Sequence, residues 1–220
     1  MVSGAYVQSK VNYGLGKTAA ALGDAYQQYR PAAPLAPIGS GSLIGAINAQ
    51  FAADPALAFA HPSQYGKPAW YGVFDPTNVR AGDYLVGILG TFFAADIERF
   101  TSLMCIWCNR TISVIRAVAP QTPGASTAYG GETSANEQTI LSGWPASVLQ
   151  LSSGSKMVNV GMRIPTDSGA GGYSILLPSL AGTPVRWNDI IVDDEGTRYS
   201  VAGNELSPLG WRLTATQWPT

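Results

Sequence analysis

One segment of this chain is written twice, as residues 79–93 and again, at a constant offset of 106, as residues 185–199. Average composition gives about one chance identity in fifteen positions, but six are identical here. In the first copy they are Val79, Arg80, Asp83, Val86, Gly90 and Thr91. Each copy reads as a turn, a short apolar strand, a glycine-containing reversal and a second strand. The repeat therefore predicts two related small β domains in tandem.

The spacing of apolar runs and turn residues extends each copy into a domain. Allowing two residues of slippage, a third strand follows in both copies, at 104–108 and 210–214. Further strands are expected at 69–74, 83–87, 91–97, 103–108 and 111–115, and at 140–151, 157–163, 173–177, 189–193, 197–202 and 211–217. The predicted boundaries are a first β domain over 55–118, a Gly/Pro/Ser-rich linker over 119–138 and a second β domain over 139–220.

The first 54 residues have a different pattern. Apolar residues recur at helical spacing over 5–23, with Gly23 as the C-cap. Residues 26–37 are rich in proline, which disfavours helix at each preceding residue, so they predict an extended arm. A short second helix is expected over 42–51. The predicted fold is mainly all-β: two duplicated β-barrel or sandwich domains with an N-terminal helix and a Pro-rich arm.

Charged residues make up only 12% of the chain, about half the usual share, whereas Gly (25) and Pro (15) are plentiful. A turn-rich β protein explains the Gly and Pro, and a surface buried against partners also explains the missing charges. The net charge of −1 and the lack of a basic cluster disfavour broad nucleic-acid binding. The sequence contains no run of eighteen apolar residues, so it predicts no membrane span, and the N-terminus lacks a secretory pattern. We expect the protein to stay in the cytoplasm where it is made.

The residues that usually carry catalysis are sparse. His61 is the only histidine, and Cys105 and Cys108, three residues apart, are the only cysteines. On a strand, this spacing points them to opposite faces, so we expect two buried free thiols. The tripeptide Gly16-Lys17-Thr18 lacks the earlier glycine of a phosphate loop. We expect no catalytic, metal-binding or cofactor-binding residue, and no enzymatic activity.

The equivalent positions of the repeat supply half of the candidates for an interface. Asp83 and Asp189 each stand just before a strand, where aspartate is typical of a turn. Arg80 and Arg186 either fix that turn or meet a neighbour's carboxylate. Together with the start of the arm, the predicted interface residues are Tyr26, Tyr29, Arg30, Pro31, Arg80, Asp83, Arg186 and Asp189.

The repeated unit resembles the small β-barrels of tailed-phage head–tail joining proteins. The resemblance rests on its V-R-x-x-D start, apolar strand, hairpin and aromatic strand, and it is closest over 185–213. Residues 12–17, 26–31, 65–71 and 108–111 are similar to structural proteins of bacteriophages and prophages. The resemblance implies a virion protein without catalytic residues. Simple joining proteins have one barrel, so two barrels with a helix and an arm suit a larger collar or adaptor better than a plain stopper.

This resemblance leads to the hypothesis of a head–tail connector, assembled in the bacterial cytoplasm as a homo-oligomeric ring between portal and tail. The segment 5–38 would reach onto a neighbouring subunit or the portal, and the Gly-rich loops 152–156 and 166–172 would lie at interfaces. Contact with packaged DNA would be transient and non-specific. The alternative is a tail or baseplate module that binds a host receptor or glycan through aromatic side chains: Trp70, Tyr71, Trp144, Trp187 and Trp211.

Overall fold

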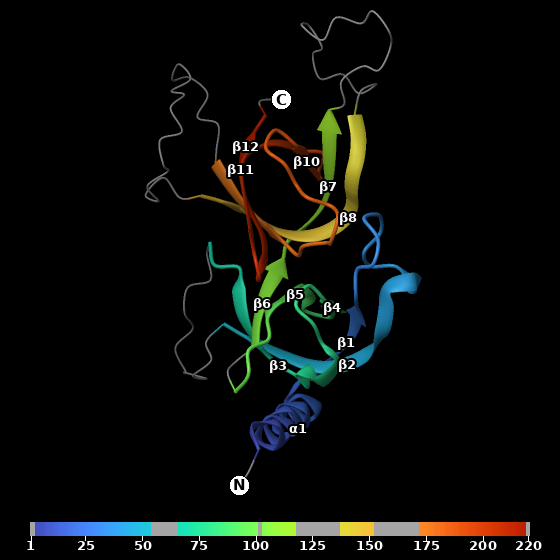
Figure 1. Cartoon of the computed structure of the whole chain (residues 1–220), viewed down its shortest axis with the longest axis vertical. Helices are drawn as coiled ribbons and strands as arrows, with labels where there is room; N and C mark the ends of the chain where they lie inside the picture. Colours follow the sequence, from blue (N-terminus) through green and yellow to red (C-terminus); the bar gives the residue numbers. More distant parts are fainter. Residues whose placement is uncertain (1–2, 54–65, 101–102, 118–136, 152–171, 219–220) are drawn as a thin grey trace, which may run out of the picture.

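The protein consists of two closed six-stranded β-barrels and one N-terminal helix (Figure 1). The computed structural model describes residues 3–53, 66–100, 103–117, 137–151 and 172–218. The barrels are stacked along the long axis of the molecule, and helix α1 (Gly4–Leu22) lies across the end of the first barrel. The N-terminus lies at that end and the C-terminus at the opposite end.

The two barrels have the same strand order. The strands of barrel 1 are β1 (Asp24–Tyr29), β2 (Leu43–Ala52), β3 (Ala69–Val73), β4 (Tyr84–Gly87), β5 (Gly90–Asp96) and β6 (Leu103–Cys108). Those of barrel 2 are β7 (Arg110–Ala117), β8 (Glu137–Gln150), β9 (Gly172–Leu177), β10 (Ile190–Asp193), β11 (Arg198–Ser207) and β12 (Gly210–Gln217). Barrel 1 runs β1-β2-β3-β6-β5-β4 and barrel 2 runs β7-β8-β9-β12-β11-β10, each closing on its first strand through antiparallel pairs. The predicted duplication is therefore confirmed, and it covers the whole barrel.

The offset between the copies changes within the repeated hairpin. It is 106 where β4 matches β10. Leu85 pairs with Phe92 in the first hairpin and Ile191 pairs with Tyr199 in the second, so β5 and β11 differ by 107. The second turn holds one more residue. The matched glycines of the sequence alignment, Gly90 and Gly196, are thus not structural equivalents.

The segment predicted as an arm and a short helix supplies two strands of barrel 1. The helix expected over 5–23 is confirmed as α1. The helix expected over 42–51 is wrong, because this segment is β2, and residues 26–29 belong to β1. Apolar residues in 43–51 fit either period, and pairing with β1 decides for the strand. Without these two strands barrel 1 would not close.

The barrel boundaries also differ from the predicted domain boundaries. Strand β6 passes into β7 through Asn109 alone, and β7 belongs to barrel 2 rather than to the first domain. Most of the predicted linker 119–138 lies outside the described residues, but the strands on either side of it, β7 and β8, pair with each other. This segment therefore connects two strands within one barrel. The strand predicted at 157–163 and the loop at 152–156 lie outside the described residues, as does all but the last residue of the 166–172 loop.

Aromatic side chains fill barrel 1. The rings of Phe51 and Phe92 stack with centroids 3.8 Å apart, and Tyr26 meets Phe51 edge-on at 5.1 Å. Cys105 faces this interior, whereas Cys108 faces the contact with barrel 2, as the alternation of a strand requires. Both thiols are free and buried, and burial raises the pKa of each. The prediction of two buried thiols on opposite faces is confirmed.

Barrel 1 covers one end of barrel 2 with the outer side of β4, β5 and β6. Tyr84, Phe93 and Ile106 join the same apolar cluster as the interior of barrel 2. The Tyr84 hydroxyl donates to the carbonyl of Pro145 at 2.7 Å, and its ring centroid lies 6.2 Å from that of Trp144. Burial raises the pKa of Tyr84 well above its usual value. The outer wall of barrel 1 is therefore part of the core of barrel 2, whereas the interior of barrel 1 forms a separate cluster.

Helix α1 covers the corresponding end of barrel 1. Gly23 precedes β1 as Asn109 precedes β7, and the first residue of each strand pairs with a buried alanine, Ala49 in one barrel and Ala146 in the other. Asn109 donates its backbone N–H to the Ala146 carbonyl at 3.1 Å. At Gly23 the approach is so close that a Cβ would lie 2.6 Å from the Ala49 carbonyl oxygen. Helix α1 thus covers an end of barrel 1 in the same way that barrel 1 covers an end of barrel 2.

We expect Gly23→Ala to lower the free energy of unfolding by about 2–4 kcal/mol, because its methyl group would overlap backbone carbonyl oxygens of Ala19 and Ala49. The control is Gly14→Ala in the same helix, where a Cβ meets no atom within 4 Å. That change should stabilise by up to about 1 kcal/mol through helix propensity. Denaturant unfolding of both variants tests the close contact, and equal effects would contradict it.

Candidate assembly surface

A buried carboxylate locks the turn before β4. Asp83 is 1% exposed and accepts hydrogen bonds from Arg30 Nε at 2.8 Å and Arg30 Nη2 at 2.7 Å. It also accepts from the backbone N–H of Arg80 at 2.9 Å and from Gln28 Nε2 at 2.7 Å. This bidentate pair joins the end of β1 to the turn, and the hydrogen bond raises the pKa of Arg30.

Barrel 2 repeats the same lock. Asp189, also 1% exposed, accepts from Arg116 Nε and Nη2, both at 2.8 Å, and from the backbone N–H of Arg186 at 2.6 Å. Each arginine also donates to a carbonyl at matching positions, Asn78 in barrel 1 and Pro184 in barrel 2. The hydrogen bond to Asp189 likewise raises the pKa of Arg116. The identical aspartates of the repeat thus hold each barrel closed from within.

These locks correct part of the predicted interface. Tyr26, Asp83 and Asp189 are buried, so they are not available to a partner, and Arg30 is bound to Asp83. Arg116 takes the corresponding role in barrel 2, and sequence reasoning missed it. The repeat does not indicate that Arg116 is the equivalent of Arg30, because the two arginines are 86 residues apart in the chain rather than 106 and their strands share little sequence.

The other predicted interface residues are at least partly accessible. The side chains of Arg80 and Arg186 are exposed, and only their main chains take part in the locks. Tyr29 and Pro31 are partly buried. Tyr29 packs against the apolar cluster formed by the interior of barrel 2 and the outer wall of barrel 1. Arg80 and Arg186 therefore remain predictions for a contact with a neighbour.

The Pro-rich segment lies on the chain's own second barrel. Leu35 forms a parallel bridge with Ser142 of β8. Ala36 N–H donates to the Ser142 carbonyl at 3.0 Å, and Ser142 N–H donates to the Pro34 carbonyl at 3.1 Å. Trp144 Nε1 also donates to Pro34 O, at 2.7 Å. The expectation that this segment reaches a neighbouring subunit is thus corrected: proline keeps it extended, and its carbonyls add it to β8.

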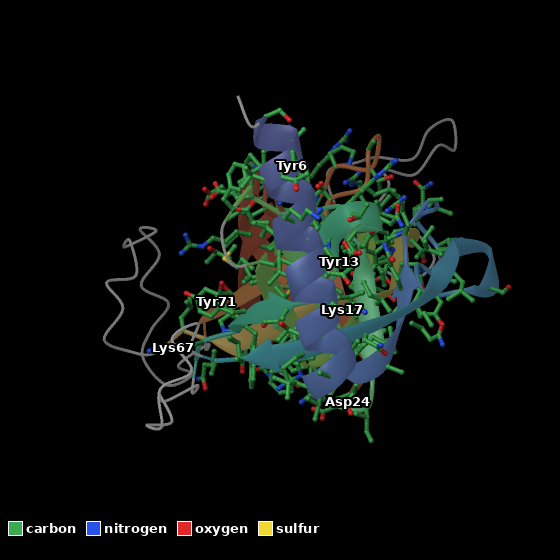
Figure 2. All side chains as sticks on the ribbon, turned by 90° about the horizontal axis from the view of Figure 1, so that it is seen from below. Tyr6, Tyr13, Lys17, Asp24, Lys67 and Tyr71 are labelled. Atoms are coloured by element: carbon green, nitrogen blue, oxygen red, sulfur yellow. The ribbon has the colours of Figure 1, made fainter. Side chains whose placement is uncertain are left out.

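The outer face of α1 forms the end of the molecule opposite barrel 2 (Figure 2). Tyr6 and Tyr13 are 55% and 63% exposed on this face. Two shallow hollows, of about 370 and 310 Å³, follow one another along the helix, and Tyr13 and Asp75 contribute to both. The helix is held below by Ala19, which is fully buried, and by Leu15, which packs against the core of barrel 1.

A second exposed feature is the tip of the β4–β5 hairpin. Ile88 and Leu89 form this turn and are 81% and 54% exposed. At the tip of the corresponding hairpin of barrel 2 stand Asp194 and Glu195, which form ion pairs with Arg110. The duplicated hairpins therefore end in different chemistry, apolar and free in one barrel and acidic and paired in the other.

No group of three or more His, Cys, Asp or Glu side chains that could hold a metal ion gathers among the described residues. Over the same ranges, no helix combines the length and hydropathy needed to cross a membrane. Comparison of the chain with protein-family models, with curated proteins and with solved structures finds no match. Among the described residues, the exposed helix face and the apolar hairpin tip are two surfaces available for contact with a partner.

Removal of either locking carboxylate should destabilise the protein. We expect Asp83→Ala and Asp189→Ala each to lower the free energy of unfolding by about 3 kcal/mol, because each leaves a guanidinium and a backbone N–H without their acceptor. The matched controls Arg80→Ala and Arg186→Ala remove exposed side chains and should change it by about 0.5 kcal/mol or less. Denaturant unfolding measures all four; losses as large in the arginine variants would contradict this assignment.

Proposed function

We propose that this chain is a structural component of a tailed-bacteriophage virion, a head–tail connector or collar protein. It assembles as a homo-oligomeric ring between the portal and the tail. The observation that carries the proposal is the stack of two duplicated barrels, in which the outer wall of barrel 1 is part of the apolar core of barrel 2. Such a stack is an elongated, stiff building block that can contact one virion layer with each barrel.

The divergence of the two copies supports this assignment. The locks and strand order are the same in both barrels, so both keep the same scaffold. The hairpin tips differ, and the Ile88-Leu89 turn exposes two large apolar side chains where turns favour Gly, Asn and Asp. Exposed apolar groups with no folding role are typical of protein contacts. Two barrels with one scaffold and different tips suit two different neighbours.

Composition and sequence resemblance support the same function. The repeated unit is similar to the barrels of phage joining proteins, and the charged fraction of 12% suits a surface largely covered by partners. The near-neutral net charge of −1 is compatible with DNA that slides past the ring with only transient, non-specific contact. The partners are other copies of the chain and the portal, adaptor and tail proteins.

The alternative function is a tail or baseplate module that binds a host receptor or glycan. Trp187 favours it, because this side chain is 66% exposed in the turn before β10. Trp144 and Trp211, however, are buried and cannot stack on a sugar. One strongly exposed tryptophan is a weaker basis than the paired barrels, so the connector is preferred.

Electron microscopy and light scattering of the purified full chain test the connector. We expect rings, alone or on addition of the portal protein, and the mass gives the copy number. The variant Ile88→Asp/Leu89→Asp should reduce ring formation, whereas the control Arg212→Ala, on an exposed position of barrel 2, should not. A monomer indifferent to portal and tail proteins would contradict the connector. If a glycan then protects the fluorescence of the exposed Trp187 from an added quencher, this would favour the alternative.

A further inference from the structure

Four side chains of α1 form a single exposed stripe. Tyr6, Lys10, Tyr13 and Lys17 follow one another at spacings of four, three and four residues, which places them on one face of a helix. Figure 2 shows Tyr6, Tyr13 and Lys17 along the face of α1 that points away from the barrel. We call these four residues the tyrosine–lysine stripe. Its aromatic and cationic groups alternate along the helix.

Each lysine of the stripe lies over the tyrosine that precedes it. Lys10 Nζ is 5.4 Å from the ring centroid of Tyr6, and Lys17 Nζ is 5.5 Å from that of Tyr13. Exposed cation–π contacts contribute only about 0.5–1 kcal/mol. They order the side chains and leave the ammonium groups open to an anion. The stripe is therefore arranged without being neutralised.

The lysines of the stripe have no carboxylate partner among the described residues. Residues 4–22 contain neither Asp nor Glu, and within the described chain neither Lys10 nor Lys17 forms an ion pair. The carboxylate of Asp75 lies in both hollows, where it accepts from the backbone N–H and the hydroxyl of Thr77 and keeps its negative charge, so only the outer side of the stripe faces solvent without a carboxylate beside it. The stripe thus keeps positive charge in a chain whose net charge is −1.

The two hollows lie beside the stripe. Tyr13 stands between the two hollows, with Arg99 in the wall of the larger and Ile47 in the wall of the smaller. Each hollow can take a side chain, and the pair offers cationic, aromatic and apolar groups within one helix length. This combination matches a segment that carries both carboxylates and apolar side chains.

We infer that the tyrosine–lysine stripe and its two hollows bind an acidic, amphipathic segment of another protein. Carboxylates of that segment pair with Lys10, Lys17 and Arg99, and its apolar side chains pack on Tyr6 and Tyr13. A nucleic acid fits less well, because affinity for a phosphate backbone comes from many cationic contacts, and this face supplies few. The inference concerns this end of the molecule and does not rest on the connector function.

The test uses the full chain and a fluorescein-labelled synthetic peptide in which glutamate and leucine alternate, with binding followed by anisotropy at low salt. We expect Lys10→Glu/Lys17→Glu to weaken binding by about tenfold or more, since it reverses both charges. Tyr13→Ala should weaken it by several-fold, and Tyr13→Phe should restore most of the affinity. The control is Lys67→Glu, an exposed lysine just before β3 that is not part of the stripe (Figure 2).

The outcomes separate the possibilities. Selective loss in the stripe variants, with unfolding midpoints unchanged, supports the inference. No peptide binding by the unaltered protein, or an equal loss with Lys67→Glu, overturns it. A DNA duplex that binds more tightly than the peptide and is lost in the same lysine variant would also overturn it, because the face would then be a nucleic-acid surface. If a stripe variant unfolds earlier, the Tyr13→Phe and Tyr13→Ala pair decides at a temperature where both are folded.

Discussion

The structure depends on covering the open end of each barrel. A closed β-barrel pairs every strand edge, but at its ends inward-facing side chains meet water unless something covers them. At one end of barrel 2 the cover is the outer side of barrel 1, anchored by Tyr84 on Trp144. At the corresponding end of barrel 1 it is α1, joined through Gly23. The same need is thus met by a barrel in one copy and by a helix in the other, and this makes the molecule a stack.

The outer wall of barrel 2 differs from the wall of barrel 1 that docks. In barrel 1 the wall that docks is apolar and buried, with Phe93 paired to Ile106. Hydrogen-bond register places Ser200 and Thr216 at the corresponding pair in barrel 2, where both are partly exposed. Hydroxyl groups at those positions would lose hydrogen bonds to water under a further barrel. The two copies therefore share one scaffold and differ in this wall, as they do in the hairpin tips.

The features that the two barrels share differ in position from the features that they do not share. The shared features, the arginine–aspartate locks and the strand order, are turned inward and maintain the barrels. The features that differ face outward: the apolar tip at Ile88, the exposed Trp187 and the helix that only barrel 1 has. Recognition of partners is therefore expected from the unrepeated surface. Of the identical residues in the repeat, Arg80 and Arg186 alone present exposed charged side chains.

The sequence by itself determined the duplication, the β class, the N-terminal helix and the opposite orientation of the two cysteines. All of these follow from local periodicity or from identities such as Asp83 and Asp189. Only the tertiary structure decided which strands close which barrel, that Arg30 and Arg116 are the partners of those aspartates, and that Pro34 and Leu35 lie on β8. These contacts join residues 50 or more positions apart, and no local pattern records them. Of the surface proposed for binding, the spacing of the stripe can be read from the sequence. Its exposure depends on which face of α1 the barrel covers, and this is settled by packing.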